Sequence, residues 1–325
     1  MNFLKMNESA VSPIVATLVL IVVAVVGAVA VGTIMGTFSS DVAGQTNAGD
    51  IAGASSAEII TAGSTTVQPA SELLAKAYMK KNPSVKITVQ GGGSGAGVAA
   101  VGNEIVDIGA ASRNVKPTEL TQFPDLKEYR IGGSAIVWVA SNEFTGLGVT
   151  EADLKAAWAD LDATGKTNAE HGSIPQGVQF YQRSETSGTE ETAAEFCGIS
   201  AKSFDAFNAP GQIGNSGMRS AIEGANVAAI GFLDFGYTND FDTAKIKTLT
   251  IDGMTPNEAN VKKGIKALFA GQTSTDYPTG LCRGLYLITN GEPSGIVKNF
   301  IQFAQSPEGG EFVNAAGMFG NAALA

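Results

Sequence analysis

The sequence of 325 residues contains a single histidine and only two cysteines. His171 lies in a polar stretch, and Cys197 and Cys282 are not spaced like metal ligands, so there is no histidine-based zinc site. We expect His171 to be a solvated loop residue. If the chain lies outside the cell, the two cysteines could form a disulfide; two free, partly buried thiols are the alternative.

Basic residues are scarce as well, since 21 Lys and Arg stand against 31 Asp and Glu and the net charge is −10. Proteins that bind the phosphate backbone of nucleic acids need clustered Lys and Arg. The composition therefore argues against a nucleic-acid partner. Any site for an anion must be formed locally, against the overall charge.

Complete catalytic motifs are also lacking. Gly92-Gly93-Ser94-Gly95-Ala96 misses the last glycine of a nucleophile elbow, and Thr164-Gly165-Lys166-Thr167 misses the first glycine of a P-loop. The run from Gly91 to Ala96 satisfies the loose dinucleotide pattern, but the acidic residue Asp107 begins the next strand instead of ending it. No carboxylate pair stands out. We expect no enzymatic activity, no metal and no cofactor.

One long stretch, residues 9–40, carries no charge at all. Its central part, residues 14–34, is almost wholly Val, Ala, Leu, Ile and Gly, which is long enough to cross a hydrocarbon layer of about 30 Å. A secretory signal core is shorter. We expect a transmembrane helix over residues 10–36, preceded by a cytoplasmic or cleaved leader over 1–9. Lys5 on its N-terminal side places the bulk of the chain outside the cell, as a cell-membrane protein with a single N-terminal anchor.

Residues 37–56 are rich in small and polar side chains, which is typical of a flexible linker. After this linker, signals for strands and helices alternate, and this order indicates an α/β fold. The expected strands are 58–62, 85–90 and 107–110, and the expected helices are 69–81 and 95–103.

Two apolar strands of similar composition, 134–140 and 285–289, bracket a central block of about 140 residues. They are expected to be crossovers between two lobes, with a ligand in the cleft between the lobes. A final helix, about 294–305, would pack back on the first lobe. The expected division is residues 57–138 for the first part of lobe 1, 139–281 for lobe 2 and 282–325 for the second part of lobe 1.

Three turns combine glycine with hydroxyl residues where a strand gives way to a helix: Gly63-Ser64-Thr65-Thr66, the run 91–95, and Ser187-Gly188-Thr189. A helix start leaves backbone N–H groups unpaired and carries about half a positive charge, so such a turn can hold an anion. Arg183 precedes the third turn, and its guanidinium can donate to two oxygens of a tetrahedral anion. The three turns together predict one shared oxyanion site.

The N-terminal segment Glu8-Ser-Ala-Val-Ser-Pro-Ile-Val resembles the start of archaeal pilin-like and related surface proteins, in which a charged leader precedes an apolar helix. This resemblance covers about 30 residues. It implies an archaeal cell-surface protein, with leader cleavage near Asn7 or Glu8. An ordinary signal anchor is the alternative.

The globular part resembles the phosphate-binding proteins of ABC importers. The resemblance rests on residues 62–69, 89–97, 107–113 and 183–189, and on three later segments in the same order: Ala229-Ile-Gly-Phe, Leu285-Tyr-Leu-Ile-Thr and Phe303-Ala-Gln-Ser-Pro-Glu-Gly-Gly. It implies a two-lobed periplasmic-binding-protein fold of the class II type that closes on dehydrated phosphate.

The resemblance also assigns site residues. The phosphate-binding positions are Thr65, Thr66, Ser94, Ser112, Arg183, Ser187, Gly188 and Thr189, with Ser64, Gly95 and Arg113 as additional candidates. One of these positions departs from the family, because many members have an aspartate where this chain has Ser112, followed by Arg113. That aspartate accepts the proton of hydrogen phosphate, so discrimination against sulfate is less secure here. Arg113 is expected either to enter the site or to brace it from behind.

These observations lead to one leading hypothesis and two alternatives. The leading hypothesis is an extracellular subunit, tethered to the membrane by its N-terminal helix, that captures inorganic phosphate for the permease subunits of an ABC importer. The first alternative is a pilin-like surface filament subunit that displays a domain for phosphate or another oxyanion. The second, an enzyme acting on phosphate esters, is weak because no catalytic base or metal cluster is visible.

Overall fold

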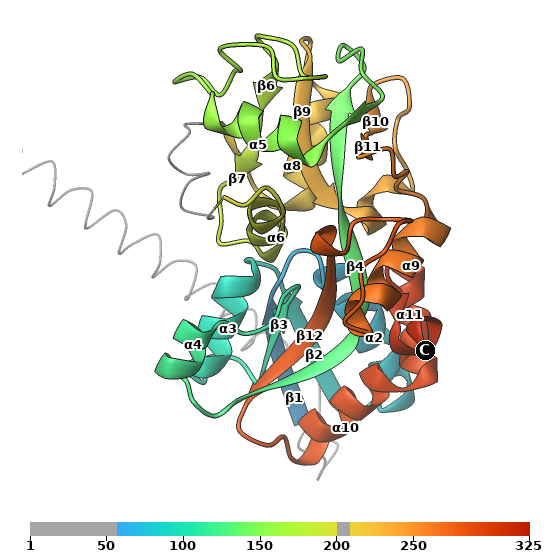
Figure 1. Ribbon diagram of the computed structural model, residues 1–325. Helices are drawn as coiled ribbons and strands as arrows, with labels where there is room; N and C mark the ends of the chain where they lie inside the picture. The colour runs from blue at the N-terminus through green and yellow to red at the C-terminus, as the bar shows by residue number, and fades with distance from the viewer. Residues whose placement is uncertain (1–56, 200–208) are drawn as a thin grey trace, which may run out of the picture. The chain divides into compact units, whose positions relative to one another are not determined.

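The computed structural model describes residues 57–199 and 209–325, all within the unit Ser55–Ala325 (Figure 1). The expected leader, transmembrane helix and linker, residues 1–56, lie outside the described residues. Among the residues that are described, no helix is both long and apolar enough to cross a bilayer.

The described part of the chain is built around one nine-stranded sheet (Figure 1). Across the sheet the order is β2 (Val85–Gln90), β1 (Ala57–Gly63), β3 (Ile108–Ala111), β12 (Cys282–Asn290), β4 (Leu126–Ser141), β9 (Ala229–Asp234) and β6 (Gln179–Phe180). β1 is parallel to β2 and β3, whereas β12 is antiparallel to β3 and β4. Two short strands, β10 (Ile246–Thr248) and β13 (Phe319–Gly320), also pair with β4. Two small sheets join β5 (Gly148–Val149) to β11 (Thr250–Ile251) and β7 (Gln182–Arg183) to β8 (Gly211–Gln212).

Helices alternate with these strands along the chain, which confirms the α/β expectation. They are α2 (Gln68–Lys81), α3 (Ser94–Gly102), α4 (Pro117–Gln122), α5 (Glu151–Ala159), α6 (Gly188–Phe196), α8 (Gly214–Glu223), α9 (Glu258–Phe269), α10 (Gly295–Gln305), α11 (Pro307–Ala315) and α12 (Asn321–Leu324), with 3₁₀ turns η1 (Phe235–Thr238) and η2 (Thr279–Leu281). The five elements expected between residues 58 and 110 all agree with the structure to within one residue at each end.

Two strands, β4 and β12, connect two lobes. From Leu126 to Ala135 β4 pairs with β12, and from Ile136 to Ala140 it pairs with β9. We name lobe 1 the part built on β1, β2, β3, β12 and the stretch of β4 that pairs with β12. Lobe 2 is the part built on β6, β9, β10 and the remaining stretch of β4. Every residue of β4 from Ile131 onward is buried, as expected of a strand covered on both faces. The expected crossovers 134–140 and 285–289 lie inside these two longer strands.

Each lobe has its own apolar core. In lobe 2 the aromatic rings of Trp138 and Phe232 meet edge to face at 5.4 Å, and those of Trp158 and Phe180 at 5.0 Å. Lobe 1 has two smaller clusters, one beneath α2 and α10 and one beneath α3. Phe319, near the C-terminus, belongs to the cluster of lobe 2. Both cores include residues of β4 and β12, which run from one lobe into the other.

The cysteines and the histidine do not form a metal site. Cys197 and Cys282 are both free and buried, and burial raises the pKa of each thiol to about 12. The alternative of a disulfide is therefore not realised. The expectation of a solvated His171 was wrong, because its Nε2 atom lies 2.8 Å from Asp160 Oδ2 and its side chain is mostly buried. This hydrogen bond lowers the pKa of Asp160.

Candidate functional site

The first turn joins β1 to α2. Ser64 stabilises the turn that leads into α2, since its Oγ accepts from the backbone N–H of Thr66 at 3.2 Å and of Val67 at 3.3 Å. These bonds are long, so the two N–H groups are only weakly held. Thr65 and Thr66 follow Ser64, and the hydroxyl of Thr66 is almost fully buried. The start of α2 thus presents hydroxyl and N–H donors together.

The second turn joins β2 to α3 and depends on glycine. Gly92 and Gly93 have φ angles of 143° and 94°, which favour glycine. A side chain on Gly93 would also collide with the carbonyl oxygen of Thr186, and a side chain on Gly95 with the methyl group of the same threonine. Gly95 therefore contributes to the site by allowing the third turn to approach closely. Ser94, the first residue of α3, is buried.

The third turn joins β7 to α6, in lobe 2. Ser187 caps α6, because its Oγ accepts from Thr189 N at 3.2 Å and from Glu190 N at 3.4 Å. Gly188 allows a close approach of the two lobes, since a Cβ atom there would lie 2.7 Å from Ser94 Oγ and 2.8 Å from the Oγ of Ser112. The start of α6 is packed directly against lobe 1.

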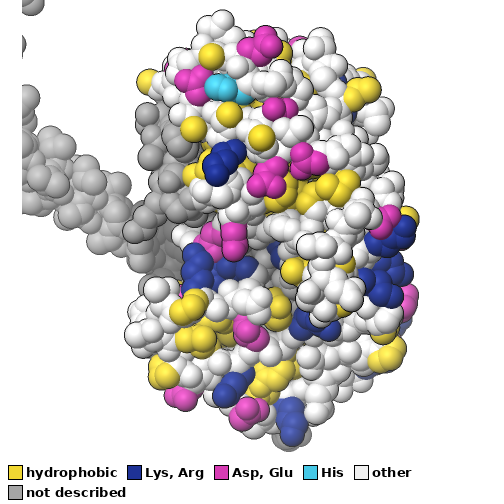
Figure 2. Space-filling model, in the orientation of Figure 1, with side chains coloured by type: hydrophobic (Ala, Val, Ile, Leu, Met, Phe, Trp, Pro, Cys, Tyr) yellow, Lys and Arg dark blue, Asp and Glu magenta, His cyan; other side chains and the backbone are white. Residues whose placement is uncertain are grey.

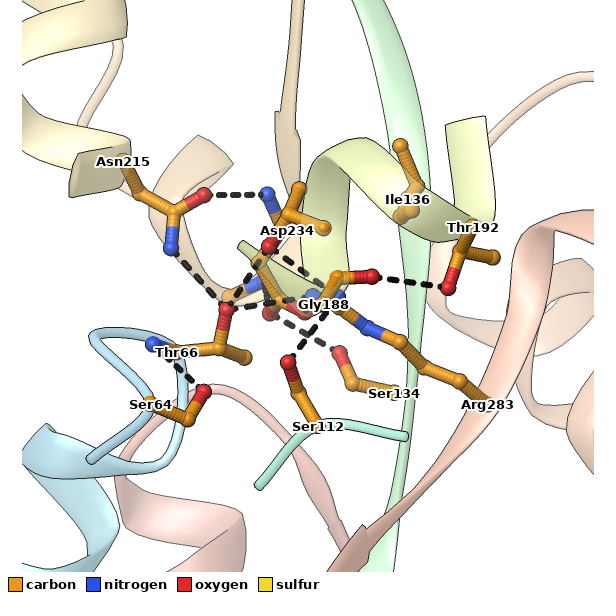
Figure 3. Close-up of polar contacts among 12 residues, drawn as sticks. Ser64, Thr66, Ser112, Ser134, Ile136, Gly188, Thr192, Asn215, Asp234 and Arg283 are labelled. Carbon is orange, nitrogen blue, oxygen red and sulfur yellow. Dashed lines mark hydrogen bonds and ion pairs between the residues drawn. The ribbon is translucent and has the colours of Figure 1, made fainter. Parts of the chain in front are cut away.

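The structure brings the hydroxyls of all three turns into one cluster, as Figure 3 shows in part. Thr66 Oγ1 lies 3.1 Å from Thr189 Oγ1 across the lobe boundary. Ser112, after β3, donates its N–H to Ser94 Oγ at 3.2 Å, and the two hydroxyl oxygens are 3.3 Å apart. The sequence predicted that these segments would meet, and they do.

Arg183 lies at one end of the cluster. Its guanidinium donates to Thr65 Oγ1 at 2.9 Å, forms an ion pair with Glu185, and is 3.4 Å from Asn215 Oδ1. The side chain of Arg183 is fully buried. Tyr237 encloses the same end, because its hydroxyl donates to the carbonyl oxygen of Thr65 at 2.9 Å, and burial raises its pKa to about 12.

Arg283, Asp234 and Asn215 are central to the cluster and were missed by sequence reasoning. Arg283 donates to Ser112 Oγ at 3.1 Å, to Thr189 Oγ1 at 3.0 Å and to Thr66 Oγ1 at 3.1 Å. Burial lowers its pKa, and the charge of Asp234, 2.6 Å away, opposes that effect. A signal was available, since Arg283 and Asp234 are charged residues at the ends of strongly apolar strands.

Arg113 is not in the cluster. Its guanidinium forms ion pairs with Glu119 of lobe 1, at 2.8 Å, and with Glu191 of lobe 2. Burial lowers its pKa, but the bond with Glu119 and the charge of Glu191 outweigh that effect, and the net shift is upward. Lys116 joins Glu191 at 2.8 Å. Basic and acidic side chains lie side by side on this face in Figure 2. Of the two expectations, the bracing role agrees with these contacts.

The charges of the cluster are balanced in pairs. Each guanidinium has its own carboxylate, Glu185 for Arg183 and Asp234 for Arg283. Three helix starts add partial positive charge at the same place. In the described part of the chain, no three His, Cys, Asp or Glu side chains are grouped as a metal would require. The cluster offers mainly hydrogen-bond donors, which suits an oxyanion held between the lobes.

Comparisons with known proteins agree with this architecture. A family model described as the PBP superfamily domain matches residues 44–308. The chain belongs to this superfamily. The protein of Bacillus subtilis (strain 168) named phosphate-binding protein PstS is 26% identical over 253 residues, 78% of this chain and 77% of that protein. The protein of the same name from Borreliella burgdorferi is 24% identical over 266 residues, 79% of this chain and 88% of that protein.

Solved structures share the fold. The crystal structure of a phosphate ABC transporter substrate-binding protein with bound phosphate from Clostridium perfringens superposes with a TM-score of 0.66 at 24% identity, covering 81% of this chain and 99% of that one. An ABC-type phosphate transport receptor from Vibrio cholerae gives a TM-score of 0.61 at 20% identity, with 81% and 100% covered. The expected two-lobed periplasmic-binding-protein fold is thereby confirmed.

Proposed function

We propose that this protein is the substrate-binding subunit of an ABC importer and that it captures inorganic phosphate. The observation that carries the proposal is the cluster at the lobe boundary, where hydroxyls of both lobes, three helix starts and two buried guanidinium groups converge. The names of the PstS relatives support phosphate as the ligand and a permease as the partner. The class II type of the fold is part of the same proposal.

In this proposal, phosphate would be held by Thr65, Thr66, Ser94 and Ser112 of lobe 1 and by Arg183, Ser187, Gly188 and Thr189 of lobe 2. The hydroxyls of Ser64 and Ser187 accept from the N–H groups of Thr66 and Thr189, and an anion would compete with them for these groups. A ligand that contacts both lobes stabilises the closed arrangement by its differential affinity. Closure by binding is what an importer subunit requires; no chemical step is involved.

Isothermal titration of the purified protein with phosphate tests the proposal. We expect heat of binding at micromolar protein, and titration with arsenate, sulfate and tungstate measures the selectivity that Ser112 leaves less certain. If phosphate gives no heat and does not raise the melting temperature, the proposed function is wrong. A phosphatase assay on the same sample distinguishes a binding protein from an enzyme that hydrolyses phosphate esters.

We also propose that residues 10–36 anchor the protein in the membrane with the binding domain outside the cell. The uncharged run in residues 9–40 supports this. After carbonate extraction of membranes, the full-length chain should stay in the pellet. A shortened chain that starts at residue 57 should appear in the supernatant. The pilin-like start at Glu8 keeps the filament alternative open, and filaments seen by negative-stain microscopy of surface preparations would favour it over a simple anchor.

A further inference from the structure

Arg283 comes from β12, the strand by which the chain returns from lobe 2 to lobe 1. Only 3% of its side-chain surface is exposed. Figure 3 shows it reaching into the cluster from the opposite side to Asn215. The two terminal nitrogens donate to Ser112 and Thr66 of lobe 1 and to Thr189 of lobe 2. One guanidinium therefore contacts predicted ligand residues from both lobes.

Asp234 holds this guanidinium in place. Its carboxylate is fully buried, and its Oδ2 accepts from Arg283 Nη2 at 2.6 Å. The other oxygen accepts from Ser134 Oγ at 2.8 Å and from the N–H of Gly236 at 3.0 Å. Burying an ion pair costs about as much as the pair returns, so it contributes little to folding by itself. A role of Arg283 in binding the anion would explain why a buried ion pair is present at this position.

Arg283 also decides which way the hydroxyl protons point. Asn215 Oδ1 accepts from Asp234 N at 3.0 Å, which leaves the Nδ2 of Asn215 to donate to Thr66 Oγ1 at 3.1 Å. Thr66 Oγ1 accepts from Asn215 and Arg283, so its proton is donated to Thr189. Thr189 Oγ1 then accepts from Thr66 and Arg283, and its own proton has no acceptor among the hydrogen bonds of the described residues. A proton so placed is available to an anion.

We propose that Arg283 is a direct ligand of the oxyanion, positioned by Asp234, and that through Thr66 it leaves the hydroxyl proton of Thr189 to be donated to that ligand. This inference rests on the proposed function. The four terminal N–H groups of Arg283 already donate to Ser112, Thr189, Thr66 and Asp234, so the donor left for the anion is Nε, which is buried and has no hydrogen-bond partner in the described part of the chain. In this proposal two arginines bind the ligand: Arg183 from lobe 2 and Arg283 from the connecting strand β12.

The test compares four variants in the full-length protein, with phosphate as the titrant. Arg283→Gln should weaken phosphate binding about thirtyfold or more, since a charged donor to the anion is lost. Arg283→Lys keeps the positive charge but not the planar guanidinium with its several N–H donors, so its affinity for phosphate should lie between those of wild type and Arg283→Gln. Arg130→Gln is the matched control, because Arg130 is an exposed arginine on β4 opposite Tyr286 of β12, and it should bind within about twofold of wild type.

The fourth variant, Arg283→Gln with Asp234→Asn, separates a ligand from a structural partner. It removes both charges, so no buried carboxylate is left unpaired, and melting curves check that it folds. If Arg283 is a ligand, binding stays about thirtyfold weaker in this double variant. Recovery to near wild-type affinity would show that Arg283 only neutralises Asp234, and would overturn the inference while leaving the proposed function intact. Absence of phosphate binding by the wild-type protein would overturn both.

Discussion

Arg183 is a charged side chain with no exposed surface. It is held by Glu185, by the hydroxyl of Thr65 and by the amide oxygen of Asn215, which come from both lobes. A guanidinium so fixed loses little entropy when it binds a ligand. Removal of such a group should therefore affect binding strongly.

We expect Arg183→Ala to weaken phosphate binding by about 2–5 kcal/mol, because a buried charge partner of the anion is lost and Glu185 is left unpaired. Isothermal titration measures the change, and Arg130→Ala serves as the control. Combining Arg183→Ala with Glu185→Gln removes the unpaired carboxylate and isolates the contact with the anion. Wild-type affinity in that double variant would exclude Arg183 from the site.

The two arginines of the cluster differ in how readily the sequence reveals them. Arg183 stands four residues before a turn of Ser, Gly and Thr, so local spacing was enough. Arg283 reaches the hydroxyls of Thr66, Ser112 and Thr189 only because β12 is inserted between β3 and β4, and that pairing joins residues more than a hundred positions apart. Asp234 belongs to the cluster because it forms the ion pair with Arg283. Contacts of such separation leave no spacing pattern in one sequence, and only the position of each charge at the end of an apolar strand marks the two residues.

At the scale of elements, the starts of α2, α3 and α6 converge. Ser187 caps α6, Ser64 bonds to the turn just before α2, and α3 begins after Gly93 without a side-chain cap. Hydroxyl and glycine residues were read correctly as helix starts because capping is a local property. Strand β4 was underestimated, since residues 127–130 are polar or charged and only their pairing with β12 identifies them as strand.

Gly188→Ala should hinder the approach of α6 to lobe 1, because its Cβ would lie within 2.8 Å of Ser94 Oγ and Ser112 Oγ. We expect phosphate affinity to fall about tenfold or more, with a smaller change in melting temperature. Gly217→Ala in α8 is the control, since the nearest atom to its Cβ would be 3.8 Å away. Equal affinity of the two variants would show that the contact at Gly188 is not needed for binding.

Helix α4 carries a pH-dependent contact. Burial tends to raise the pKa of Glu119, but hydrogen bonds from Arg113 and from the backbone N–H of Lys116 outweigh burial and lower it below its ordinary value of 4.5. A lowered carboxylate pKa contributes stability above pH 4.5, and this stability is lost as the pH falls through the folded-state value.

The melting temperature of the wild-type protein should therefore fall more steeply below pH 4.5 than that of Glu119→Gln. Thermal unfolding between about pH 7 and pH 3 measures the two slopes. Glu143→Gln, at an exposed position, is the control and should follow the wild-type curve. Parallel curves for wild type and Glu119→Gln would contradict the prediction.

At the scale of the whole molecule, two lobes share one sheet and meet in polar contacts. Besides the cluster, they are joined by Glu191 of α6, which pairs with Arg113 and Lys116. The side chains of Glu191 and Arg113 are 13% and 10% exposed. Contacts of this kind favour the closed arrangement without touching the ligand.

Glu191→Gln should weaken phosphate binding about fivefold by making closure less favourable, while selectivity among oxyanions is unchanged. Glu195→Gln, one helical turn further along α6 and exposed, is the matched control. Titration with phosphate and arsenate measures both quantities. A change in the ratio of the two affinities would mean that Glu191 acts on the ligand itself.

The route of the chain through its lobes also bears on the order in which they fold. β3 is completed by β12, with Ala111 opposite Tyr286, so lobe 1 consists of two stretches separated by the whole of lobe 2. During synthesis the first part of lobe 1 emerges, followed by lobe 2 as a continuous stretch, which can form most of its core before β12 leaves the ribosome. Until then β3 has a free edge that another chain could pair with. Strand β12 therefore covers the edge of β3, and a nascent chain that stalls before Cys282 would expose a sheet edge prone to aggregation.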